Sequence, residues 1–129
     1  MNPIDGLRIL IVDDEVADVT AKMVTKLGGV PLPTRSIAEA RMVLARRTFD
    51  AALVDLLLLN GNGADLIREL QLVQNLPCVL FSGVDAETMG FEGIDCIFLA
   101  KPFTLETLRS ALLEAIGESD TVAPPEGSR

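Results

Sequence analysis

Short apolar segments alternate with amphipathic segments along most of the sequence, and this alternation restricts the possible folds more than any other feature. Five apolar segments are typical of β-strands: residues 7–12, 30–34, 50–55, 77–82 and 95–100. Amphipathic segments that predict helices follow the first, second, third and fifth of them. Strands that alternate with helices form parallel sheets covered on both faces. The sequence therefore predicts an α/β fold with a doubly wound, five-stranded parallel sheet.

The predicted helices have start and stop signals and apolar stripes. Gly28 and Gly29 predict the end of the first helix, Ser36 and Glu39 form a capping box that opens the second, and Thr104 is the predicted N-cap of the last. The expected inward-facing residues are Val16, Val19, Met23, Val24 and Leu27; then Ile37, Ala40, Val43 and Leu44; then Leu66, Ile67 and Leu70; and finally Leu105, Leu108, Leu112 and Ile116.

Three segments depart from the regular pattern. Pro31 and Pro33 cannot donate hydrogen bonds to a neighbouring strand, so segment 30–34 is predicted at an edge of the sheet. Residues 84–94 contain two glycines and predict at most a short helix. Residues 118–129 are polar and rich in Pro and Gly. We therefore expect one domain over residues 1–117, followed by a disordered tail over residues 118–129.

Composition excludes several classes of function. The 129 residues are 49% hydrophobic, which suits one domain with an apolar core. A net charge of −8 disfavours binding to nucleic acid or to anionic membranes. The absence of His excludes histidine-based catalysis and histidine metal ligands. No segment has the length of a membrane span or the pattern of an export signal, so we expect a cytoplasmic protein.

The two cysteines, Cys78 and Cys96, both lie in apolar, strand-like segments. We expect them to be reduced residues of the core. The alternative is a disulfide between them, which would suit an exported protein.

Polar side chains stand at the carboxyl ends of four predicted strands. Asp13 and Asp14 follow the first strand, and Asp55 ends the third. Ser82 ends the fourth strand, and Lys101 follows the fifth. Because the carboxyl ends of parallel strands meet at one edge of the sheet, where ligands bind, we expect these groups to converge. Three carboxylates repel one another, and oxygen ligands without His or Cys favour a hard cation such as Mg²⁺ or Mn²⁺.

A carboxylate beside a divalent cation, an ammonium and a hydroxyl is suited to accept a phosphoryl group. Asp55 is the best candidate, because a carboxylate that ends a central strand has no evident capping role. Each of the other residues also has an ordinary structural explanation: Asp13 could cap a helix, and Ser82 and Lys101 are common types at strand ends. Only their combination indicates a site.

The order of these residues over about residues 5–117 resembles the receiver domain of response regulators in two-component signalling. The resemblance implies a flavodoxin-like sheet in the order 2-1-3-4-5. It also implies a single-domain response regulator that accepts a phosphoryl group from a sensor histidine kinase or a histidine phosphotransfer protein. Such a protein is not an enzyme beyond catalysing its own phosphorylation and dephosphorylation. It signals through contacts with a downstream protein, unknown here, and the kinase is expected to dock near residues 16–26.

The resemblance further implies roles for the site residues. Asp55 would accept the phosphoryl group and bind Mg²⁺, with Asp14 as a direct ligand and Asp13 acting largely through water. The backbone carbonyl of Leu57 would complete the protein ligands.

Four further residues have roles implied by the resemblance. Ser82 and Lys101 would contact the phosphoryl group, and Pro102 would follow a cis peptide bond. Phe98 matches an aromatic switch that turns inward behind Ser82 on activation, and simple core packing is the alternative for this residue.

The sequence departs from the family pattern in two places. Leu59 replaces the proline usual four residues after the acceptor, although the expected Gly63 is present. Ser82 and Lys101 are closer in sequence than usual, which predicts a shortened fourth helix and an altered output face. Leu57 and Val84, two residues after Asp55 and Ser82, resemble family positions that influence the access of water, and because both are apolar we expect slow loss of the phosphoryl group.

Three other classes of protein share parts of the pattern. A phosphorylation-independent pseudo-receiver is the main alternative, but such modules typically lack a carboxylate or the lysine, and this chain has all of them. A phosphatase- or dehalogenase-type enzyme needs a second Asp two residues after its nucleophilic Asp. In this chain, Val16 occupies that position after Asp14, and Leu57 occupies it after Asp55. A flavin-binding protein needs a phosphate-binding loop after the first strand, where Asp13, Asp14 and Glu15 would repel the phosphate.

Overall fold

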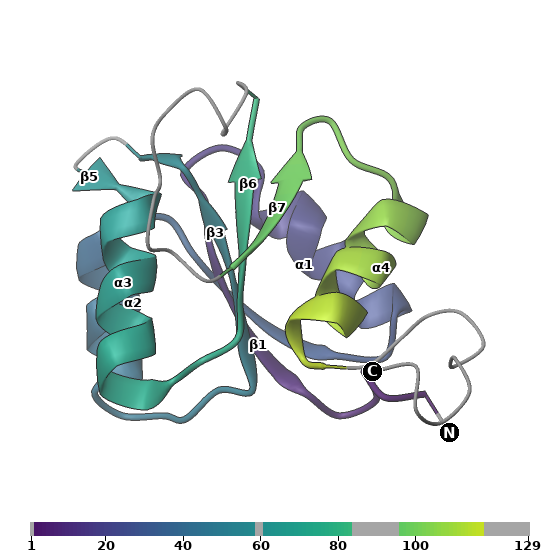
Figure 1. Ribbon diagram of the computed structural model, residues 1–129, viewed down its shortest axis with the longest axis horizontal. Coiled ribbons are helices and arrows are strands. Elements are labelled where there is room, and N and C mark those ends of the chain that lie inside the picture. Colours follow the sequence, from purple (N-terminus) through teal and green to yellow (C-terminus); the bar gives the residue numbers. More distant parts are fainter. Residues whose placement is uncertain (1, 59–60, 84–95, 118–129) are drawn as a thin grey trace, which may run out of the picture.

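A five-stranded parallel sheet forms the centre of the molecule (Figure 1). The computed structural model describes residues 2–58, 61–83 and 96–117. The strands are β1 (Arg8–Val12), β2 (Val30–Thr34), β3 (Ala51–Asp55), β6 (Cys78–Ser82) and β7 (Ile97–Ala100). Their order is β2-β1-β3-β6-β7, and every neighbouring pair is parallel. The predicted fold class and strand order are confirmed.

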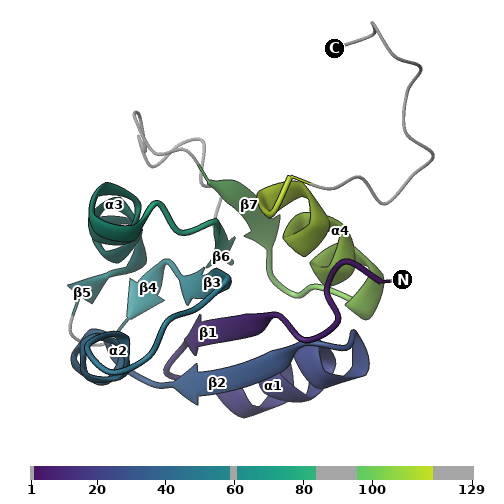
Figure 2. The ribbon, with the colours of Figure 1, turned by 90° about the horizontal axis from the view of Figure 1, so that it is seen from below.

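Among the described residues, two helices cover each face of this sheet (Figures 1 and 2). Helices α1 (Ala17–Lys26) and α4 (Leu105–Ala115) pack on one face, and α2 (Ile37–Leu44) and α3 (Gly63–Gln74) pack on the other. Ser36 accepts a hydrogen bond from the backbone N–H of Glu39 at the start of α2, and Thr104 exchanges hydrogen bonds with Thr107 at the start of α4. The two predicted N-caps are therefore confirmed, but the capping box predicted at Ser36 is only half formed, because the carboxylate of Glu39 accepts from the backbone N–H of Arg35 instead.

Alternate residues of the three central strands, β1, β3 and β6, enter two separate apolar cores. Ile9, Ile11 and Leu53 point toward α1 and α4, where they form one core, defined here as the α1/α4 core. Leu10 and Val54 point the other way, into the α2/α3 core. Because strand side chains alternate between faces, a central strand with both faces covered is apolar at nearly every position. This is why β1 and β3 are nearly continuous apolar runs.

The edge position predicted for β2 is also confirmed. Pro31 lies opposite Ile9 and Pro33 opposite Ile11, and β1 is the neighbour of β2 in the sheet. A strand with two prolines can pair on one side only, because the missing N–H groups must face away from the ladder.

The inward faces predicted for α1 and α4 need a correction. Val19 is 58% exposed, whereas Ala17, Thr20 and Val24 are the buried residues of α1. Small side chains at Ala17 and Thr20 allow the helix to approach the sheet closely, which turns Val19 to the side. In α4, Leu108 and Leu112 are buried as predicted, but Leu105 in the first turn is 38% exposed.

A short antiparallel hairpin after β3 was not predicted. It pairs β4 (Leu57–Leu58) with β5 (Gly61–Asn62), directly before α3, where the sequence indicated only a turn. The buried residues of α3 include Leu66, Ile67 and Leu70, as predicted.

Several predictions concern residues outside the described ranges. They are Leu59, Val84, the shortened fourth helix over residues 84–94 and the tail over residues 118–129. In the part of the chain that is described, none of the helices combines the length and the apolar character needed to cross a bilayer.

Candidate functional site

Residues from three strands meet at the edge of the sheet formed by the carboxyl ends. Asp13 follows β1, Asp55 ends β3, and Lys101 follows β7. The Nζ atom of Lys101 lies 3.0 Å from Oδ2 of Asp13 and 3.3 Å from Oδ2 of Asp55. One ammonium group therefore bridges two carboxylates, and both carboxylates are buried.

The carboxylate of Asp13 uses its two oxygens differently. Oδ1 accepts hydrogen bonds from the backbone N–H groups of Glu15 and Val16, at 2.8 and 3.1 Å, and Oδ2 pairs with Lys101. The side chain thus organises the turn before α1 and also contacts the site. The alternative that Asp13 is the N-cap of α1 is wrong, because the N-cap is Val16 and no side chain caps it; the hydrogen bonds of Asp13 lie in the preceding turn.

Asp14 completes an acidic cluster with Asp13 and Asp55. Each residue offers one carboxylate oxygen, and these oxygens lie within 4.8 Å of one another. Asp13 and Asp55 are buried and Asp14 is partly exposed. The three carboxylates outweigh the single charge of Lys101 by two negative charges, and all the ligand atoms are hard oxygens. These residues fit a divalent hard cation such as Mg²⁺.

The environment shifts the pKa values of Asp55 and Lys101 in the same direction. Burial, together with the nearby charges of Asp13 and Asp14, raises the pKa of Asp55, and the attraction of Lys101 opposes this only in part. Burial lowers the pKa of Lys101, but the contacts with Asp13 and Asp55 outweigh it, so that its pKa is raised. Lys101 therefore stays protonated, whereas the charged form of Asp55 is disfavoured without a further cation.

Close packing against Gly63 holds the backbone of Asp55. A Cβ atom at Gly63 would overlap the carbonyl group of Asp55. The backbone N–H of Gly63 donates to the carbonyl of Leu56 at 2.8 Å, and the N–H of Leu56 donates to the carbonyl of Phe81 at 2.8 Å. The start of α3 thus contacts the chain at the candidate acceptor, and only glycine fits there.

Ser82 and Lys101 are brought to the same edge by the pairing of β6 with β7. Ser82 lies opposite Ala100, and the backbone N–H of Lys101 donates to the carbonyl of Ser82 at 2.9 Å. Ser82 is only 5% exposed. The Lys101–Pro102 peptide bond is cis, as the resemblance implied.

Leu57 and Phe98 lie near these residues with their side chains exposed. Leu57 is 59% exposed in β4, two residues after Asp55, and its carbonyl remains a predicted ligand. Phe98 is 44% exposed, so the core-packing alternative for it is wrong. Ile97 and Leu99 pack against the α1/α4 core, and alternation along β7 therefore turns Phe98 to the opposite face.

Sequence reasoning missed the part played by Thr34. Its hydroxyl donates to the carbonyl of Ile11 at 2.6 Å, and its own carbonyl accepts the backbone N–H of Asp13 at 3.1 Å. Thr34 therefore ties the end of β2 to the turn that holds Asp13. The sequence does show a hydroxyl residue at the end of the edge strand β2. Its contact with the turn at Asp13 could be predicted only from the register of β2 against β1.

An apolar groove lies beside the acidic cluster. A cavity of about 400 Å³ is lined by Val16, Val19 and Met23 of the α1 region, by Phe103 and by Lys101. We call this the α1 groove. Val16 and Val19, the two residues of the predicted α1 stripe that do not pack in the core, line this groove.

Comparisons with known proteins agree with this geometry. The response regulator receiver domain model matches residues 9–113. The response regulator protein PilR of Pseudomonas aeruginosa is 34% identical over 118 residues, which cover 84% of this chain and 26% of PilR. The regulatory protein VirG of Rhizobium rhizogenes is 27% identical, over 95% of this chain and 53% of VirG. The chain spans about a quarter of PilR and about half of VirG.

Solved structures agree as well. A response regulator receiver protein from Sinorhizobium medicae WSM419 superposes with a TM-score of 0.78 at 26% identity, covering 86% of this chain and 94% of that one. A sensor protein from Polaromonas sp. JS666 has a TM-score of 0.73 at 30% identity, covering 85% and 95%. With the family match over residues 9–113, the strand order and the acidic cluster at the carboxyl edge, the chain belongs to the response regulator receiver family of two-component systems.

Proposed function

We propose that Asp55 accepts a phosphoryl group from the phosphohistidine of a sensor histidine kinase or a histidine phosphotransfer protein. The observation that supports this most strongly is the contact of Lys101 with both Asp13 and Asp55 inside an acidic cluster. If Lys101 served only to stabilise the fold through an ion pair, one carboxylate partner would be enough. Here the excess negative charge is concentrated around one buried carboxylate at the edge of the sheet where ligands bind.

In the proposed reaction, a carboxylate oxygen of Asp55 attacks the phosphorus atom and the phosphorus–nitrogen bond to the donor imidazole breaks. The products are an aspartyl phosphate and a neutral histidine. Lys101 can neutralise a phosphoryl oxygen from its position 3.3 Å from Asp55. The hydroxyl of Ser82 would bind another oxygen, and Phe98 would turn inward behind it as a switch.

We further propose that Asp13, Asp14, Asp55 and the carbonyl of Leu57 hold Mg²⁺, or Mn²⁺ in its place. When bound, the cation would neutralise charge on the transferred group. Asp14 is the better direct ligand, because it is partly exposed, whereas both oxygens of Asp13 already accept hydrogen bonds from other groups. Asp13 would act largely through water. The three carboxylates within 4.8 Å support this assignment.

The α1 groove suits the docking of the phosphodonor. Its apolar lining of Val16, Val19 and Phe103 runs up to Lys101, so a helix bound there would lie next to Asp55. The family relationship supports a cytoplasmic signalling module over residues 1–117, which acts through a downstream protein rather than on nucleic acid or membrane. The exposed apolar Leu57 supports slow hydrolysis of the aspartyl phosphate, because it can hinder the approach of water.

Acetyl phosphate provides a direct test. The chain is incubated with this donor with and without Mg²⁺, and its intact mass is measured. We expect one phosphoryl adduct that requires Mg²⁺ and is absent from Asp55→Asn. The matched control is Asp65→Asn, which alters an exposed carboxylate in the first turn of α3 and should retain the adduct. Failure of folded wild-type protein to form an adduct and to bind Mg²⁺ would identify a pseudo-receiver and overturn the proposal.

A further inference from the structure

The two cysteines lie side by side at the end of the sheet opposite to the acidic cluster. Cys78 is the first residue of β6, and Cys96 directly precedes the first residue of β7. The two strands are parallel, and Val79 lies opposite Ile97. Cys78 and Cys96 are therefore the next opposing positions along the two strands, whereas Ser82 and Ala100 form the pair at the other end.

This register suits a disulfide. Neighbouring strands lie about 4.8 Å apart, which is within the Cα separation of about 4.4–6.8 Å that a disulfide requires. Opposing residues of paired strands point to the same face, and both cysteines belong to or pack against the α2/α3 core. Their proximity is also evident in the pKa of Cys78, which burial raises most and the neighbouring Cys96 raises further, to about 12.

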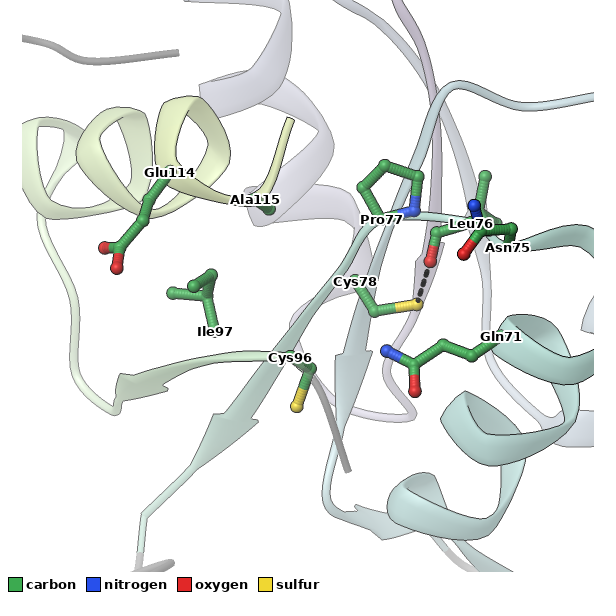
Figure 3. A pocket seen from close by; sticks show the side chains of 9 residues that line it. All are labelled: Gln71, Asn75, Leu76, Pro77, Cys78, Cys96, Ile97, Glu114 and Ala115. Atoms are coloured by element: carbon green, nitrogen blue, oxygen red, sulfur yellow. Dashed lines mark hydrogen bonds between the residues drawn. The ribbon is translucent and has the colours of Figure 1, made fainter. Parts of the chain in front are cut away.

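Both thiols are reached from one cavity. Cys78 and Cys96 line a pocket of about 510 Å³ between the α3 and α4 sides of the sheet, together with Gln71 and Glu114 (Figure 3). Cys78 is buried and its thiol contacts the carbonyl of Leu76 at 3.2 Å, whereas Cys96 is partly exposed. A small reagent that enters the pocket therefore meets Cys96 as the more accessible thiol.

We propose that Cys78 and Cys96 form a reversible intrachain disulfide when the protein meets a hydroperoxide. The sulfur of Cys96 attacks a peroxide oxygen, the O–O bond breaks, and a sulfenic acid and one water form. The thiol of Cys78 gives up its proton as its sulfur attacks the sulfur of Cys96, the S–O bond breaks, and the hydroxide leaves with that proton as a second water. In total the two thiols lose two electrons and two protons, and hydrogen peroxide is reduced to two waters.

The disulfide would join the first residue of β6 to the residue before β7 without touching the acidic cluster. It closes the loop over residues 79–95, so it restricts the unfolded chain more than the folded one. We expect the Tm of the oxidised protein to rise by on the order of 10 °C, and a dithiol reductant to reverse the rise. The proposal does not depend on phosphorylation of Asp55.

The test is thiol counting by mass. Reduced full-length chain is treated with hydrogen peroxide, denatured and blocked with N-ethylmaleimide. We expect a monomer that has lost the mass of two hydrogen atoms and takes up no maleimide. After reduction by dithiothreitol it should take up two. Peptide mapping of the wild-type chain should recover one cross-linked pair containing Cys78 and Cys96, which needs no variant to fold.

Single substitutions distinguish the two thiols. Cys96→Ser changes the partly exposed residue, and Cys78→Ala removes the buried thiol with no hydroxyl left in the core. Neither should show the loss of two hydrogens, and the Tm of each should not respond to peroxide. Three results would overturn the proposal: two labelled thiols after oxidation, disulfide-linked dimers in place of the monomer, or a sulfinic acid on Cys96 with Cys78 still labelled.

Discussion

At the scale of single residues, the charge balance around Asp55 predicts an unusual dependence of stability on pH. Burial and the nearby charge of Asp13 raise the pKa of Asp55 in the metal-free protein. Between the ordinary value of about 3.9 and this raised value, the folded state binds more protons than the unfolded state. The stability that Asp55 contributes is therefore present at low pH and is lost as the pH rises through its folded pKa.

Asp55→Asn should therefore stabilise the metal-free protein near pH 7, by on the order of 1 kcal/mol. Because the asparagine does not titrate, the advantage should shrink as the pH falls through the raised pKa of Asp55. The measurement is urea denaturation in a chelator across this pH range. As a control, excess Mg²⁺ should remove the advantage near pH 7, since the cation favours the charged carboxylate. An advantage that is the same at every pH would contradict the assignment.

Two buried threonines offer a matched pair for a stability test. Thr20 and Thr34 are each 1% exposed. Among the described residues, the hydroxyl of Thr20 has no hydrogen-bond partner, whereas that of Thr34 donates to Ile11. Valine has almost the same shape without the hydroxyl. Thr20→Val should raise the free energy of unfolding by about 1 kcal/mol, and Thr34→Val should lower it by about 1–3 kcal/mol.

Chemical denaturation of the two variants and the wild type measures this difference. Thr34→Val should also slow phosphorylation by acetyl phosphate, because Thr34 holds the turn that contains Asp13. Equal destabilisation by the two substitutions would show that the hydroxyl of Thr20 is bonded in solution.

At the scale of elements, the contact between the start of α3 and the end of β3 predicts a sharp effect at one glycine. In Gly63→Ala, the new methyl group would displace the carbonyl of Asp55. We expect a loss of about 1–3 kcal/mol in stability and a slower reaction with acetyl phosphate. Gly83→Ala is the control, because no atom of the described residues lies within 4 Å of a Cβ atom at Gly83. If Gly63→Ala matched Gly83→Ala in both measurements, the close contact would not exist in solution.

The strands were predictable from the sequence to within one or two residues at each end. β2 was expected over residues 30–34 and spans Val30–Thr34, and β6 was expected over residues 77–82 and spans Cys78–Ser82. This succeeded because central parallel strands are apolar on both faces and end where a polar residue begins. The same rule predicts Asp13, Asp55 and Lys101 at one edge of the sheet.

The orientation of side chains around the elements was harder to predict. The apolar spacing correctly predicted that residues 17–26 form a helix. In the structure, however, α1 packs against the sheet through Ala17 and Thr20, and Val19 is exposed. Phe98 faces away from the α1/α4 core because its neighbours in β7 occupy it. The β4–β5 hairpin forms by pairing of Leu57 and Leu58 with Asn62 and Gly61, in a segment where apolar periodicity predicts only a turn. In each case the outcome depends on contacts between elements, which local patterns do not encode.

At the scale of the whole molecule, a cation bound by the acidic cluster should stabilise the entire fold. Asp13, Asp14 and Asp55 follow or end different strands, so the site exists only when the sheet is formed. A ligand that binds only the folded state adds a free energy of RT ln(1 + [L]/Kd), which is about 1.4 kcal/mol at ten times Kd. We therefore expect Mg²⁺ to raise the Tm by several degrees.

Thermal denaturation at constant ionic strength measures this effect, with NaCl replacing MgCl₂ in the reference. Asp14→Asn should lose most of the Mg²⁺-dependent rise, because Asp14 is the proposed direct ligand, whereas Asp65→Asn should keep it. The same rise in Asp14→Asn as in wild type would place the cation elsewhere on the acidic surface.

The sheet separates two cores, and no buried side chain of the described residues belongs to both, which has a consequence for how the protein can change. Substitutions among Leu66, Ile67 and Leu70 alter only the α2/α3 side, and those among Val24, Leu108 and Leu112 alter only the α1/α4 side. One side of the molecule can therefore accumulate compensating substitutions while the other stays constant. A library of variants that carry substitutions only on the α2/α3 side would vary the surface on that side, and every variant would keep the α1 groove unchanged.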